Sequence, residues 1–184
     1  MERRDFLKTA CAAGLCSCAI ATLVAADENQ SAAEQPPKDD WRVAFGKQRY
    51  AKLVSVVAAK VDAETFAEII EEVGRFCGSS GFAGQFVGDL DGFLAEMRKR
   101  WHAEAELDRE RGVVRLSFAT PEGDCACPLM GKGLVPAAAC RCSVGAIRQG
   151  FTVVTQRAVA CELKQSALRG DPRCAFEVRL GAAG

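Results

Sequence analysis

The chain has 184 residues, and its 24 Lys and Arg residues are balanced by 24 Asp and Glu residues. A formal net charge of zero argues against a nucleic-acid or anionic-membrane partner recruited by bulk charge. The length beyond the first 40 residues suits one domain with a hydrophobic core.

The chain begins with a basic segment followed by an apolar one. Residues 3–8 read Arg-Arg-Asp-Phe-Leu-Lys, and residues 9–26 carry no charge. This pattern resembles a twin-arginine export signal, which implies passage of the folded chain through the twin-arginine translocase into the periplasm. The run is rich in Ala, Cys and Gly, which favours removal before Asp27 over a membrane anchor. A lipid-anchored form through residues 15–18 is an alternative.

We therefore expect a signal peptide at residues 1–26, a flexible linker at 27–40 and a cysteine-rich domain at 41–184, with no stable membrane span after processing. The linker is polar and contains two prolines, a composition that does not support a packed core.

Three runs in the first part of the domain have apolar residues at helical spacing. The predicted helices lie at 50–61, 66–76 and 90–101. Asp62 and Asp89 are placed to cap the second and third helices. Gly78 is expected to end the second helix, so that residues 78–81 form a connecting loop.

From residue 104 the apolar pattern alternates, which is typical of strands. The predicted strands lie at 104–108, 113–118, 159–163 and 174–180. A further helix is expected after Pro136, ending near Phe151. Helices followed by antiparallel strands and one more helix predict a single α+β domain.

Seven cysteines follow the export segment, and six are candidate metal ligands: Cys125, Cys127, Cys140, Cys142, Cys161 and Cys174. Four of them form two Cys-x-Cys pairs. On a helix, Cys140 and Cys142 would point roughly 200° apart, so they are not expected to share one ion unless they lie in the frayed first turn of that helix. One thiol from each pair could instead converge with Cys174. Cys77 is interpreted as a small core residue.

Three interpretations of these thiols stay open. Thiolates are preferred structural ligands of zinc, so a zinc or other soft-metal site is the first. An oxidising compartment also permits disulfides, although an odd number of thiols leaves one over. A redox-active or nucleophilic thiolate is the third. The single histidine, His102, has no nucleophile near it in sequence, which favours a binding role over catalysis.

The tail from residue 142 to 180 carries a recognisable set of residues: Cys142, Glu162, Gly170, Asp171, Cys174 and Phe176. It resembles the C-terminal half of the vinyl-4-reductase (hydrocarbon-binding) domain family. That resemblance implies a fold akin to TRAPP subunits, a buried apolar pocket, and a zinc ion on cysteines and a carboxylate. Cys142 and Cys174 match two of those ligands.

Ser166 stands where the family has a third cysteine, and Cys125, Cys127 or Cys161 could compensate. The alternation of the strand places Cys161 toward the core and Glu162 away from it, so Glu162 is a weaker candidate ligand. The tail is similar to the L-2-amino-thiazoline-4-carboxylic acid hydrolase-like family as well.

The sequence thus predicts an exported protein that binds a metal, a small apolar or thiol-containing ligand, or both, through its cysteines. The alternatives are a thiolate- or metal-dependent hydrolase of the thiazoline-carboxylate type and a dithiol redox protein. No nucleic-acid partner is expected.

Overall fold

The computed structural model describes residues 41–120, 125 and 127–181. The predicted signal peptide at 1–26 and linker at 27–40 lie outside the described residues. Within the described part of the chain, no helix combines the length and the apolar character needed to cross a membrane.

Two helices come first, α2 (Trp41–Lys60) and α3 (Ala63–Ser80). Asp62 caps α3 as predicted, because its Oδ1 accepts the backbone N–H groups of Glu64 and Thr65, each at 3.0 Å. The predicted stop at Gly78 is wrong. The helix continues to Ser80, so residues 78–80 are helical and not a connecting loop.

The reason is a close crossing of α3 with α5 (Arg141–Thr155), which follows the short 3₁₀ helix η3 (Ala137–Cys140). A Cβ atom at Gly74 would collide with the carbonyl oxygen of Cys142, and one at Gly78 with that of Ala146. Gly145 on α5 lies equally close to the carbonyl oxygen of Glu71. Glycine therefore brings the two helix backbones into contact here.

The 3₁₀ helix η1 (Phe82–Phe86) leads to α4 (Leu90–Trp101). Asp89 caps α4 as predicted, accepting the Gly92 N–H at 2.9 Å. The helix ends at His102, whose φ of 49° is left-handed, and this histidine is exposed.

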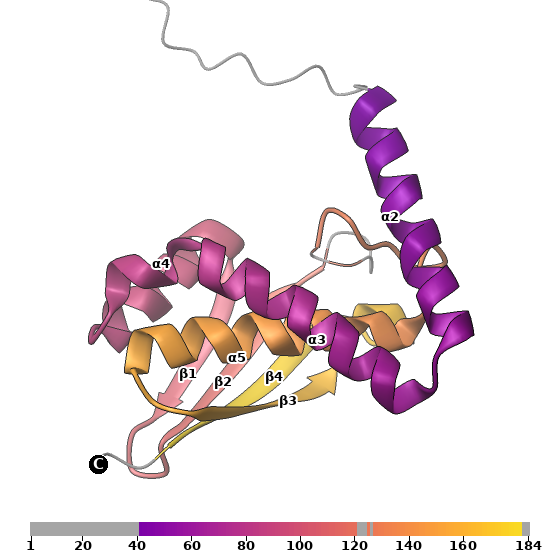
Figure 1. Ribbon diagram of the computed structural model, residues 1–184. Helices are drawn as coiled ribbons and strands as arrows, with labels where there is room; N and C mark the ends of the chain where they lie inside the picture. The colour runs from indigo at the N-terminus through magenta and orange to yellow at the C-terminus, as the bar shows by residue number, and fades with distance from the viewer. Residues whose placement is uncertain (1–40, 121–124, 126, 182–184) are drawn as a thin grey trace, which may run out of the picture. The chain divides into compact units, whose positions relative to one another are not determined.

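Four antiparallel strands form one sheet in the order β1-β2-β4-β3. Their bounds are β1 Ala103–Asp108, β2 Val113–Ala119, β3 Val159–Gln165 and β4 Arg173–Leu180. The final hairpin places β4 beside β2, with Cys174 opposite Phe118. Helices α3, α4 and α5 cover one face of the sheet (Figure 1).

The main core lies between that face and the helices. Its fully buried side chains include Leu94, Leu116, Val144, Phe151 and Val178. The predicted α+β class is confirmed: the helices precede and interrupt an antiparallel sheet in a single domain.

Candidate functional site

A second, smaller core gathers four of the cysteines. Cys125, Cys127, Cys140 and Cys142 pack there with apolar residues of α2 and α3, among them Val54. The sequence pattern alone does not show that these segments are neighbours. In the fold, the segment that carries Cys125 and Cys127 packs beside η3 and the start of α5, which carry Cys140 and Cys142.

Cys140 makes the most direct polar contact in this core. Its sulfur lies 2.6 Å from the hydroxyl oxygen of Ser166, and either group can supply the bridging hydrogen. Ser166 is fully buried between β3 and the 3₁₀ helix η4 (Ala167–Arg169). Its backbone N–H donates to Asp171 Oδ2 at 2.7 Å, and the Asp171 N–H returns to the Ser166 carbonyl oxygen at 3.1 Å. Asp171 thus holds the loop that positions Ser166.

Cys125 links the two Cys-x-Cys pairs with β4. Its sulfur accepts the Cys127 backbone N–H at 3.4 Å. Burial raises the pKa of the Cys125 thiol to about 11; the Cys127 N–H acts in the opposite direction, and the charges of Cys127, Cys174 and Cys140 act in the same direction as burial. Charge effects of this kind require proximity.

Cys142 packs in the same small core as Cys125, Cys127 and Cys140. Burial raises the pKa of its thiol to about 12, and the charges of Cys77 and Cys127 contribute in the same direction. Tyr50 of α2 shares this environment: burial, followed by the charge of Cys142, raises the pKa of its phenol to about 12. We call Cys125, Cys127, Cys140, Cys142 and Cys174 the thiol cluster.

Cys161 is buried in the main core, as Cys174 is, and burial raises the pKa of its thiol to about 12. The charges that act on it come from Arg148, Glu71 and Arg141 and from no other cysteine. Buried Glu71 pairs with both arginines, with Arg148 at 2.9 Å.

Glu162, the carboxylate next to Cys161, points away from the core as the strand alternation predicts. It is exposed and pairs with Lys164 at 2.8 Å. Four of the six predicted ligands thus pack in the smaller core, and the other two, Cys161 and Cys174, are buried in the main core. Of these two, Cys174 contributes to the raised pKa of Cys125 and Cys140.

Thiol donors fit zinc or another soft metal by their chemistry. Within the ranges that the structure describes, however, no three His, Cys, Asp or Glu side chains are positioned to hold one ion together. Burial raises the pKa of Cys125, Cys140 and Cys142, so these thiols keep their protons at neutral pH. Metal binding would require the sulfurs to lose protons and to draw together.

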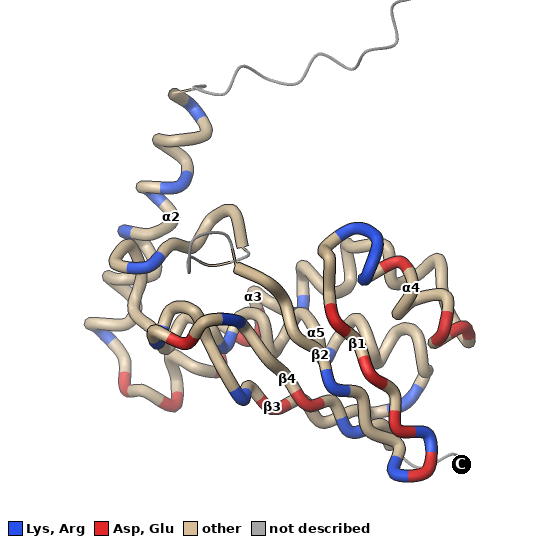
Figure 2. Tube along the Cα trace, turned by 180° about the vertical axis from the view of Figure 1, so that it is seen from behind, with Lys and Arg blue, Asp and Glu red and all other residues tan. Residues whose placement is uncertain are grey.

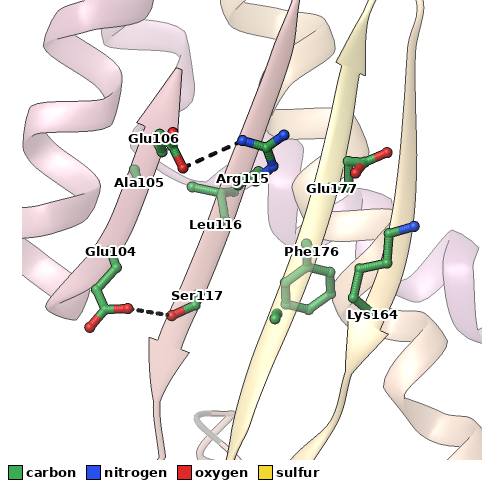
Figure 3. Close-up of a pocket in the computed structure, with 10 residues that line it drawn as sticks. Glu104, Ala105, Glu106, Arg115, Leu116, Ser117, Lys164, Phe176 and Glu177 are labelled. Carbon is green, nitrogen blue, oxygen red and sulfur yellow. Dashed lines mark hydrogen bonds and ion pairs between the residues drawn. The ribbon is translucent and has the colours of Figure 1, made fainter. Parts of the chain in front are cut away.

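Two hollows on the described surface lie elsewhere. One, of about 330 Å³, lies on the sheet face opposite the helices (Figure 3). Its charged side chains pair locally: Glu104 accepts from Ser117 at 2.9 Å, and Arg115 lies 3.5 Å from Glu106. The other, of about 670 Å³, lies beside α3 and includes Arg75. No cysteine lines either hollow.

Sequence reasoning did not find Tyr50 as a neighbour of the cysteines. Its helical spacing marked it only as a core residue, and nothing in the local pattern points to a thiol more than 70 residues away. Ser166 stands where the family that the tail resembles has a cysteine, but its contact with Cys140 could not be predicted from the sequence.

Comparison with known proteins supports the fold. No known protein family matches the chain by its sequence profile, and no curated protein matches it. The structure is similar to the crystal structure of a trafficking protein particle complex (TRAPP) subunit 3 from Naegleria fowleri covalently bound to palmitic acid. The TM-score is 0.52 at 18% sequence identity, and the match covers 78% of this chain and 98% of the subunit.

An H-NOX domain from Shewanella oneidensis, determined by NMR in the Fe(II)CO state, aligns with a TM-score of 0.44 and 14% identity. That match covers 76% of this chain and 78% of the domain. The TRAPP likeness agrees with the fold that the tail resemblance implied.

Proposed function

We propose that the thiol cluster binds a soft metal ion, zinc in the first place. In this proposal the chain is a binding or accessory protein that the twin-arginine translocase exports to the periplasm. The observation that supports the proposal is the packing of Cys125, Cys127, Cys140 and Cys142 in one small core. Cys174 of β4 adds to it, because its charge raises the pKa of both Cys125 and Cys140.

Cys125, Cys140 and Cys174 are the ligands that we assign, with Cys127 or Cys142 as the fourth donor. A bound zinc ion would hold the thiols as thiolates and add its binding free energy to the stability of the fold. A site of this kind would tie the segment carrying Cys125 to the start of α5 and to β4.

Two polar groups are placed to support the sulfurs. The Cys127 N–H donates to the sulfur of Cys125, and the Ser166 hydroxyl is within hydrogen-bond distance of the sulfur of Cys140. Donors of this kind stabilise a thiolate and orient it toward a metal. Asp171 does not contact a sulfur in this way; it accepts the Ser166 backbone N–H and so positions the Ser166 hydroxyl.

The environment of the thiols supports a binding role over the two alternatives. A nucleophilic or redox-active cysteine works through a thiolate and therefore needs a lowered pKa. Burial instead raises the pKa of Cys125, Cys140 and Cys142. A nucleophilic or redox role of Cys125, Cys140 or Cys142 is therefore the weaker candidate.

An apolar ligand is an addition to this proposal, supported by the shared fold alone. The TRAPP subunit carries covalently bound palmitic acid. Organic extraction of the purified protein, followed by mass spectrometry, tests the addition for this chain. A retained fatty acid or aromatic compound would support it, and an empty extract would remove it while leaving the metal proposal in place.

The ligand assignment is tested with two matched serine variants. Cys174 and Cys161 are both 8% exposed and both lie in strands, so Cys174→Ser and Cys161→Ser cost similar packing. We expect Cys174→Ser to lower metal content and melting temperature together, and Cys161→Ser to keep its metal. Equal metal content in the two variants would contradict the assignment.

A further inference from the structure

Helix α2 has an unusual charge composition. Its 20 residues include five Lys or Arg and no Asp or Glu, although the whole chain has no net charge. Figure 2 shows the basic positions distributed along the helix, from its first turn to its end. Helix α2 is therefore strongly cationic even though the chain as a whole has no net charge.

The same helix exposes large apolar side chains. None of residues 41–50 is buried, and the first buried residue is Ala51. Trp41 is 68% exposed, and Phe45 is 50% exposed. Large aromatic side chains exposed to this degree call for an apolar environment that the described domain does not supply.

Aromatic and basic side chains share one face of α2. Trp41, Phe45, Arg49, Lys52 and Val56 follow one another at spacings of four and three residues, which places them on one stripe. Arg49 lies over the Phe45 ring at 5.6 Å, and Arg42 over the Trp41 ring at 5.7 Å. Each aromatic ring is thus paired with a guanidinium group that can also reach a phosphate.

We propose that this face of α2 binds the surface of a membrane rich in anionic lipids. Tryptophan and phenylalanine would enter the headgroup region, and the lysine and arginine side chains would meet the lipid phosphates. Val56 on this stripe and Leu53 beside it are exposed aliphatic residues, which favour a lipid surface over a nucleic acid because they suit an acyl boundary. This is peripheral binding by a helix lying on the surface, not a membrane span.

Trp41 provides a direct reporter, because the chain has only two tryptophans. In the full chain with Trp101→Phe, we expect the emission of Trp41 to move to shorter wavelength with phosphatidylglycerol vesicles. Phosphatidylcholine vesicles should produce no such shift, and high salt should reverse the shift with anionic vesicles. Vesicle flotation of the unmutated chain repeats the comparison if Trp101→Phe fails to fold.

A charge-matched pair of triple variants tests the helix itself. Changing Arg42, Arg49 and Lys52 to Gln should weaken binding to anionic vesicles by roughly a hundredfold, at about 1 kcal/mol per cation. Changing Arg109, Arg111 and Arg115 to Gln removes the same charge from the β1–β2 hairpin and should leave binding unchanged.

Several outcomes would overturn the proposal. Equal binding to phosphatidylcholine vesicles would assign membrane binding to general hydrophobicity or to the apolar residues 9–26. Unchanged binding by the α2 triple variant would remove this helix from the interaction. A Trp41 shift with an oligonucleotide or an acidic peptide, but not with vesicles, would identify a different class of partner.

Discussion

The sulfur of Cys140 lies 2.6 Å from the hydroxyl oxygen of Ser166, and both side chains are buried. The two residues are 26 positions apart and meet only because η3 and η4 pack together at one end of the sheet. In the family that the tail resembles, a cysteine stands at the position of Ser166. The serine therefore occupies a place beside Cys140 that a third thiol would fill.

Ser166→Cys is expected to tighten metal retention. The substitution adds a thiol next to Cys140, whose pKa the charge of Cys174 also raises. The increase in side-chain volume is small. The measurement is the concentration of a competing chelator needed to remove half of the bound zinc. Ser80→Cys adds an exposed thiol on α3 and serves as the control. Equal retention in the two folded variants would separate Ser166 from the metal site.

Gly74→Ala is expected to lower the free energy of unfolding by about 2 kcal/mol or more. The new methyl group would collide with the Cys142 backbone carbonyl, which belongs to a helix and cannot move alone. Gly46→Ala on α2 meets no atom within 4 Å and should gain up to about 1 kcal/mol from helix propensity. Urea denaturation of both variants provides the comparison, and similar effects would show that the α3–α5 crossing has room to spare.

Stability should fall at alkaline pH, and Cys161 is one of the buried groups that cause the fall, with Cys125, Cys142 and Tyr50. Burial raises the pKa of the Cys161 thiol from an ordinary 9.0 to about 12, so the unfolded chain releases this proton first. The stabilisation is complete below pH 9 and is lost as pH rises from about 9 toward 12. Urea midpoints across that range, measured with chelator present, should show a shallower fall in Cys161→Ala than in the unmutated chain. Cys77, which was predicted as a small core residue, is instead exposed on α3, so Cys77→Ala should keep the original slope.

The features that depend on neighbouring residues could be predicted from the sequence. Asp62 and Asp89 cap their helices because a cap acts on the next three residues. The outward direction of Glu162 follows from strand alternation alone. The prediction that Gly78 ends its helix is wrong, because this glycine lets α3 pass close to the Ala146 carbonyl oxygen of α5. No local sequence pattern reveals that contact.

The candidate site was predictable in composition but not in geometry. The two Cys-x-Cys pairs and Cys174 mark thiol chemistry, and the helical turn between Cys140 and Cys142 explains why they have different neighbours. The position of Cys161 relative to Cys174 depends on the register of the β3–β4 pair, which places Cys161 opposite Val178 rather than opposite Cys174. The approach of Tyr50 depends on where α2 packs, which the sequence pattern of α2 does not determine.

The central claim is that the thiol cluster is a metal site, and elemental analysis with thiol counting tests it most directly. The protein is purified without chelator, and metal and reactive thiols are measured before and after a chelator is added. We expect close to one zinc or other soft-metal ion per chain, with additional thiols becoming reactive as the metal is removed. Absence of metal, together with thiol counts that chelation does not change, would contradict the account.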